Sequence, residues 1–137
     1  MSIDYTLTPI GIVRSYLKRL EDAPKQGHEG APDAWIELDA AYTAGLEGVK
    51  VGSEIIVITW LHQASRDMLQ VHPRGNKNLP LTGVFGTRSP HRPNPLGIHR
   101  VKVLAIEGTR LKVGPLEALD GTPVVDIKSA MPRDRDA

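Results

Sequence analysis

Residues 54–61 read EIIVITWL and form the most strand-like stretch of the sequence. Most of these residues are β-branched and Trp60 is aromatic, which favours an extended backbone. The run carries no charge after its first residue. Such a stretch is typical of a central strand packed on both faces, so residues 54–61 predict the middle of a β-sheet.

The rest of the chain is divided into short segments by eleven prolines and thirteen glycines, a pattern typical of β-rich folds. We expect further strands at residues 5–13, 34–38, 99–106, 111–113, 116–119 and 124–127. Alternation within 99–106 places Val101 and Val103 on one face of its strand and Arg100 and Lys102 on the other. Six or seven strands would close into a barrel-like sheet, so the sequence predicts an all-β fold.

Helical signals are few. Residues 41–49 could form one or two turns, but Gly45 and Gly48 lower their helix propensity. Residues 87–97 contain three prolines and therefore predict a shaped loop. No strand is followed by a glycine-rich turn and a helix, so we expect neither a dinucleotide-binding core nor an ordinary methyltransferase core.

At 137 residues the chain has the size of one domain, which we assign to residues 1–131, with a polar tail at 132–137. Its net charge is +1, so a polyanionic partner would have to bind a local basic patch. Residues 66–102 supply one, with seven basic residues and the single acid Asp67. Cysteine is absent, and no signal peptide or membrane span is apparent, so we expect a cytoplasmic protein.

Residues 83–97, GVFGTRSPHRPNPLG, contain the first group of residues suited to chemistry. The prolines at 90, 93 and 95 restrict the backbone before a ligand arrives, which lowers the ordering cost of binding. Arg88 and Arg92 could bind a carboxylate or a phosphate through their guanidinium forks. The alternative is a rigid crossover whose arginines contact only solvent, and the residues alone leave both interpretations open.

Two other segments carry polar groups. Residues 119–128, LDGTPVVDIK, begin with a turn whose amides could bind a ribose or an adenine edge, and Asp126 and Lys128 then share a strand face. A hairpin with a surface ion pair explains the same pattern. His62 and Gln63 follow the strand at 54–61 and could line a site, although a lone histidine is more often structural. The remaining histidines lack zinc-ligand spacing, so no metal site is expected.

Several of these segments together resemble one known family, the TsaA-like or TrmO family. The resemblance rests on residues 9–15 (PIGIVRS), 23–26 (APKQ), 62–63 (HQ), 83–101 (GVFGTRSPHRPNPLGIHRV) and 119–128, in the family's order and spacing. It covers roughly residues 3–128. Members of the family are similar in forming a single-sheeted β-barrel that binds S-adenosylmethionine without a Rossmann core. Its characterised members methylate the N6 nitrogen of threonylcarbamoyl-adenosine beside the anticodon of threonine tRNAs.

The resemblance implies a pocket for S-adenosylmethionine. Its lining would comprise Pro24, Lys25, Gln26, His62, Gln63, Arg88, Ile98, Leu119, Asp120, Gly121 and Thr122. The amides of residues 120–122 would read the adenosine, and Arg88 would hold a carboxylate. Asp126 or His62 would help to remove the proton of the acceptor nitrogen. Phosphates of tRNA, or the threonyl carboxylate, would be contacted by Arg92, Arg100 and Lys128.

The sequence departs from the family pattern at three places. Lys25 replaces the usual arginine, Ser129-Ala130 replaces a Pro-Tyr pair that could stack on cofactor or base, and the sequence stops at Ala137 where well-known bacterial members continue into a C-terminal domain. We expect tRNA adenine-N6 methylation. The alternatives are a methyltransferase with a small-molecule or protein substrate and a non-catalytic S-adenosylmethionine-binding module. A homodimer, the family's usual assembly, would suit a small barrel with open sheet edges.

Overall fold

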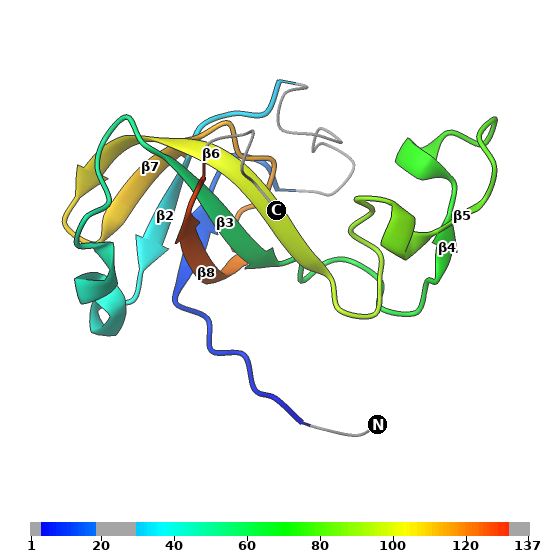
Figure 1. Ribbon diagram of the computed structural model, residues 1–137, viewed down its shortest axis with the longest axis horizontal. Coiled ribbons are helices and arrows are strands. Elements are labelled where there is room, and N and C mark those ends of the chain that lie inside the picture. The colour runs from blue at the N-terminus through cyan, green and yellow to red at the C-terminus, as the bar shows by residue number, and fades with distance from the viewer. Residues whose placement is uncertain (1–3, 19–29, 132–137) are drawn as a thin grey trace.

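The computed structural model describes residues 4–18 and 30–131, and six of its strands close into one antiparallel barrel (Figure 1). The barrel strands are β1 (Gly11–Arg14), β2 (Ala34–Leu38), β3 (Glu54–Trp60), β6 (Leu96–Glu107), β7 (Arg110–Gly114) and β8 (Pro123–Ser129). Around the barrel their order is β1-β2-β7-β6-β3-β8. The all-β barrel expected from the sequence is therefore confirmed, and closure pairs the barrel's sheet edges, which the sequence analysis had left open.

A small arm extends from the barrel between β3 and β6 (Figure 1). It contains the two-stranded sheet of β4 (Gln70–Val71) and β5 (Thr82–Gly83) and the single 3₁₀ turns η4 (Pro73–Gly75) and η5 (Val84–Gly86). The 3₁₀ helix η3 (Ala40–Leu46) lies on the opposite side of the barrel from the arm (Figure 1). None of the helices in the described ranges is long and apolar enough to cross a membrane.

The barrel interior is filled by the inward side chains of every strand. Val57, Val101 and Val103 are almost fully buried, and they belong to a core that also contains Val13, Ala34, Ile36, Leu38, Ile55, Leu111, Val113, Leu116, Ala118 and Val124. β3 pairs with both β6 and β8, so its central position is confirmed. Only one face of β3 is fully buried, because the other face of a barrel strand points outward.

Two expected strands differ from the structure. Of residues 5–13, only the end forms β1, because β2 is followed by η3 from Ala40 and no longer offers a partner beyond Ile10. Residues 116–119 bury apolar side chains but form no ladder. The helix candidate at 41–49 is the 3₁₀ helix η3. A buried segment without strand partners has the same apolar sequence pattern as a buried strand. The prediction of a strand at residues 116–119, which rested on hydrophobicity, was therefore wrong.

Gly11 marks the closest approach of β1 to β2. A Cβ at this position would lie 2.5 Å from the Glu37 carbonyl oxygen and 3.1 Å from Leu38 Cα, which are backbone atoms that cannot rotate away. We expect Gly11→Ala to lower the free energy of unfolding by about 1–3 kcal/mol, measured by urea denaturation. The control is Gly45→Ala in η3, where the added Cβ meets nothing within 4 Å. Equal stability of the two variants would contradict this packing.

Candidate functional site

A cleft of about 980 Å³ lies where the arm meets the barrel. Its walls come from segments that are distant in the sequence: the residues after β3, the arm, the loop before β6, the first residues of β6, and the stretch 117–122. Most of its lining area is apolar, with a few charged groups. Concave, largely apolar surfaces with few polar groups are the usual form of small-molecule sites, so this cleft is the candidate functional site.

The loop between η5 and β6 is held by hydrogen bonds within it and to the neighbouring segments. The Arg92 guanidinium donates to the carbonyls of Val84 and Thr87, the second at 2.9 Å. His91 Nδ1 accepts from the Ser65 amide at 3.0 Å, and the Arg92 amide donates to the Ser65 carbonyl at 3.1 Å. The shaped loop is therefore confirmed, and Arg92 acts as an internal clamp of the loop although it also borders the cleft.

Six of the residues expected to bind the cofactor line this cleft. They are His62, Gln63, Arg88, Ile98, Leu119 and Thr122. They come from four segments that are brought together only by barrel closure. Pro24, Lys25 and Gln26 lie outside the described residues. Asp120 and Gly121 are adjacent in sequence to cleft residues but are not among those that line it.

The backbone amides of residues 120–122 bond within the protein, although Thr122 itself lines the cleft. The amides of these residues donate to the carbonyls of Leu17, Val13 and Leu119 at 2.7, 2.8 and 3.1 Å. All three N–H groups are thus occupied, and the expected reading of an adenosine by these amides does not fit the structure. The turn instead holds the segment after β1 beside the end of the barrel.

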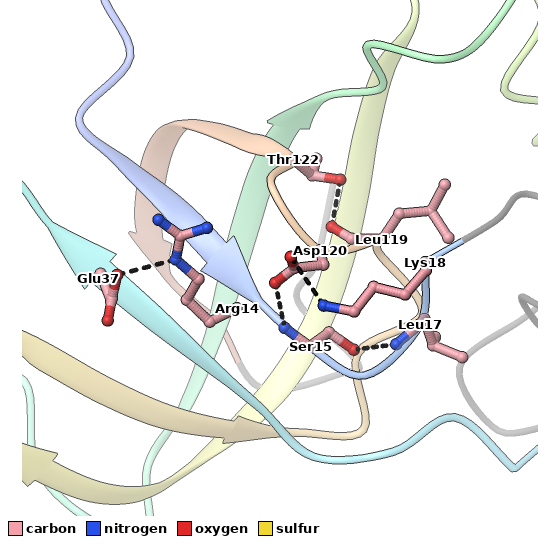
Figure 2. A network of polar contacts seen from close by, with 8 residues as sticks. All are labelled: Arg14, Ser15, Leu17, Lys18, Glu37, Leu119, Asp120 and Thr122. Atoms are coloured by element: carbon pink, nitrogen blue, oxygen red, sulfur yellow. Dashed lines mark hydrogen bonds and ion pairs between the residues drawn. The ribbon is translucent and has the colours of Figure 1, made fainter.

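The Asp120 carboxylate completes this connection. Its Oδ1 accepts from the Ser15 amide at 3.0 Å, and its Oδ2 lies 2.9 Å from the Lys18 ammonium (Figure 2). The hydrogen bond from the Ser15 amide lowers the pKa of Asp120 the most, Lys18 lowers it next, and the charge of Arg14 adds to their effect. Burial raises this pKa, but by less than these groups together lower it. The structure therefore assigns Asp120 a stabilising role, which its sequence motif did not reveal.

Three other expected site residues do not line the cleft. Asp126 borders a second hollow of about 700 Å³ beside η3, together with Ser129 and Ala130. Its carboxylate lies 3.6 Å from Lys128 Nζ, and both side chains are at least half exposed, so the surface ion pair expected from the spacing is present. Arg100 pairs with Glu54 at 3.4 Å on the outer side of the barrel. Ser129 and Ala130, which replace the Pro-Tyr pair of the family pattern, thus lie away from the cleft.

A polar pair that the sequence did not single out, the buried His99 and the partly exposed Glu117, forms part of the cleft wall. His99 Nδ1 lies 2.6 Å from Glu117 Oε1, and His99 Nε2 lies 2.7 Å from the buried Thr59 hydroxyl. Burial raises the pKa of Glu117, but the hydrogen bond and attraction of His99, its own amide and the charge of Arg88 together hold this pKa below its ordinary value. Glu117 is therefore an anion at neutral pH.

The charges around the cleft have one dominant sign. Among the described residues that line it, Arg74, Lys77, Arg88 and Arg92 are basic, and Glu117 is the one acid. Arg88 is exposed and has no hydrogen bond or ion pair to any other described residue. The arrangement can therefore accept a ligand that is mainly apolar or anionic and that carries a single cationic group.

The lowered pKa of Asp120 makes a testable contribution to stability. A carboxyl whose folded pKa lies below its unfolded pKa stabilises the fold above the unfolded value, here 3.8, and this contribution disappears as the pH falls through the folded value. We expect Asp120→Asn to lose about 0.5–1 kcal/mol at pH 7, since solvent screens the exposed Lys18 partner. Urea denaturation between pH 7 and pH 3 should show the deficit shrinking below pH 4.

Asp126→Asn is the matched control, because its ion pair is exposed and lies at 3.6 Å. It should change stability little at any pH. A deficit of Asp120→Asn that stays constant down to pH 3 would contradict the assigned role.

Comparisons with known proteins identify the family of the chain. The profile of the family described as tRNA-methyltransferase O N-terminal domain matches residues 12–135. A protein of Archaeoglobus fulgidus named S-adenosyl-L-methionine-binding protein is 46% identical over 126 residues, 92% of this chain and 89% of that protein. A protein of Methanothermobacter thermautotrophicus named probable S-adenosyl-L-methionine-binding protein is 42% identical over 126 residues, 92% of this chain and 90% of that protein.

Solved structures give the same result for the fold. A crystal structure of TrmO from Pseudomonas aeruginosa superposes with a TM-score of 0.76 at 32% sequence identity, covering 98% of this chain and 60% of that one. The chain thus spans about three fifths of this solved relative. The family match over residues 12–135 and the identities above 40% lead to one conclusion: the chain belongs to the family of the tRNA-methyltransferase O N-terminal domain.

Proposed function

We propose that this protein is an S-adenosylmethionine-dependent methyltransferase that methylates the N6 nitrogen of threonylcarbamoyl-adenosine in tRNA. The observation that carries the proposal is the convergence of the family's motif residues on one cleft. His62, Arg88, Ile98 and Leu119 come from separate segments and line the same cavity. Convergence on a shared cavity is what a binding site requires and what a set of unrelated structural motifs would not produce.

The residues of the cleft fit the cofactor. Its volume of about 980 Å³ and its mainly apolar walls suit a nucleoside, and its charged groups suit an amino-acid end. S-adenosylmethionine supplies an electrophilic methyl group on a sulfonium sulfur. The protein's part is to hold the two reactants in line and to exclude water, and good alignment can contribute about 7–11 kcal/mol.

The proton of the acceptor nitrogen needs a neighbouring group. His62 lines the cleft and is exposed, so it can reach a bound acceptor. Asp126, the other candidate, borders the second hollow instead of the cleft. We therefore assign the proton-accepting role to His62 alone.

The basic side chains favour a polyanionic acceptor. Arg74, Lys77 and Arg88 surround the cleft, where Glu117 is the one acid among the described lining residues. Phosphate contacts of this kind weaken steeply with salt. One observation favours a second candidate: the two archaeal relatives are named only as binding proteins, which suits a non-catalytic S-adenosylmethionine-binding module.

Methylation can be tested directly. The purified chain is incubated with labelled S-adenosylmethionine and tRNA that carries threonylcarbamoyl-adenosine, and nucleosides are analysed by mass spectrometry. We expect the N6-methylated nucleoside, with turnover reduced about 10-fold or more by Arg88→Ala, because a charged contact in the cleft is lost. Arg14→Ala, which removes an exposed ion pair with Glu37 on the outside of the barrel, is the matched control.

The outcomes separate the candidates. If tRNA that lacks the threonylcarbamoyl group is methylated as fast as the modified tRNA, the proposed acceptor is contradicted. Cofactor binding without transfer to any tRNA would favour the binding module.

We also propose that the protein forms a homodimer through its arm. Closure leaves the barrel without free sheet edges, so the two copies would not associate by pairing barrel strands. Five large apolar side chains of the arm are exposed, and the three most exposed are Leu69 at 64%, Leu81 at 52% and Phe85 at 81%; the other two are Met68 and Leu79. Apolar side chains grouped on a projecting element are typical of an interaction surface. A second copy of the chain would cover them and close the cleft, which Leu81 and Phe85 border.

Sedimentation velocity tests the dimer. We expect Phe85→Ser to weaken dimerisation by about 10-fold or more, because burial of one aromatic side chain contributes about 1.5–3 kcal/mol. Val51→Ser, at an exposed position near η3, should leave the association unchanged. A wild-type monomer at high concentration would refute the proposal.

A further inference from the structure

The cleft contains two opposite charges that lie near each other without pairing. Arg88 and Glu117 both line it, and the Arg88 charge lowers the pKa of Glu117. No hydrogen bond or ion pair joins Arg88 to Glu117, whose ion-pair partner among the described residues is His99. Arg88 has no hydrogen-bond or ion-pair partner among the described residues, and Glu117 bonds only to the His99 side chain, so both charges remain available in the cleft to a ligand that carries a carboxylate and an ammonium group.

We propose that Arg88 and Glu117 bind the zwitterionic α-amino acid end of the cofactor, Arg88 its carboxylate and Glu117 its ammonium group, and that His99 is the residue that positions Glu117. This inference rests on the cofactor assigned in the proposed function. It adds an anionic binding residue, Glu117, and its support, His99.

Glu117 is fixed from behind, through one carboxylate oxygen. Its Oε1 lies 2.6 Å from His99 Nδ1, and the His99 side chain is only 4% exposed. The Glu117 side chain is 23% exposed and faces the cleft. His99 is the one side chain that bonds to it within the described ranges. The carboxylate is thus held in place and still has acceptor capacity for a ligand.

His99 is fixed in turn by Thr59. The His99 Nε2 atom lies 2.7 Å from Thr59 Oγ1, and Thr59 is fully buried. With the proton on Nδ1, the ring donates to Glu117 and accepts from the Thr59 hydroxyl, so every polar atom of the bridge has a partner. An alternative orientation would leave a buried polar group without a hydrogen bond, at a cost of about 1–3 kcal/mol.

Gly97 makes room for this bridge. It lies opposite Thr59 in the ladder of β3 and β6. A Cβ at position 97 would lie 2.5 Å from Thr59 Oγ1 and 2.8 Å from His99 Nε2. The His99 ring therefore occupies the space that a side chain at 97 would fill. Strand register and the missing side chain together orient the ring toward Glu117.

The low pKa of Glu117 distinguishes between roles for its carboxylate. A general base works best with a pKa near the operating pH, whereas a permanent anion suits a cation-binding group. Charge-assisted hydrogen bonds to an ammonium and a carboxylate are among the strongest that a protein forms. The pair should therefore select nucleosides that carry an amino-acid end.

Calorimetry of the purified chain with three ligands tests this selection. S-adenosylmethionine and S-adenosylhomocysteine carry the amino-acid end, and 5′-methylthioadenosine lacks it. We expect Glu117→Gln to weaken binding of the first two by about 10-fold to 100-fold and to leave binding of the third unchanged. Glu107→Gln, at an exposed position at the far end of β6, is the matched control and should change none of them.

Two substitutions at His99 test the positioning role. His99→Leu removes the donor to Glu117 and should reduce the preference for the amino-acid-bearing ligands over 5′-methylthioadenosine. His99→Asn can still donate to Glu117 and should restore much of that preference. The preference is a ratio of two affinities measured on one sample, so partial unfolding, which thermal melts would reveal, does not change it.

Several results would overturn the inference. Equal weakening of all three ligands by Glu117→Gln would make Glu117 a structural residue. Loss confined to S-adenosylmethionine would place the sulfonium, not the ammonium, at Glu117. A wild type that binds all three ligands equally would refute the pair while leaving the proposed function intact. A wild type that does not bind S-adenosylmethionine would refute the proposed function itself.

Discussion

The pairing of β3 on both sides, with β6 and with β8, is the constraint on which the rest of the structure depends. It closes the barrel, and closure sets Thr59 opposite Gly97 and leads the chain out into the arm after Trp60. The register between β3 and β8 shifts at Ile58/Thr59, beside the cleft. A bulge there bends the strand locally, as is common next to functional sites. The cleft is therefore a consequence of how one strand is paired.

The polar groups around the cleft divide into those that build it and those that face a ligand. Arg92 clamps the proline-rich loop, and Asp120 ties the turn at 120–122 to the segment after β1. Their side chains are occupied by other parts of the protein. Arg88 and Glu117 instead present charge to the cavity. Residues three or four positions apart in the sequence thus have different tasks, and only their hydrogen-bond partners distinguish those tasks.

Much of the fold could be predicted because strand signals are local. Alternation, β-branched runs and turn residues identified the strands that became β2, β3, β6, β7 and β8, although their ends were displaced by up to three residues. The same alternation contained a sign of the buried histidine, since His99 shares its face with Val101 and Val103. Glu117 was also marked, as a charge between two buried apolar residues. Neither sign names a partner, because the two residues come from different strands or loops and meet only after closure.

The sequence by itself determined that the chain forms an all-β barrel, because alternation and turn residues act within a few positions. It also determined the family, since the motifs at 83–101 and 119–128 are long. The tertiary structure alone decided which motif residues share a cavity, moving Asp126, Lys128 and Arg100 away from the cleft and bringing in His99 and Glu117. Distance across a closed barrel depends on strand order and register, and those depend on pairings between segments far apart in the chain.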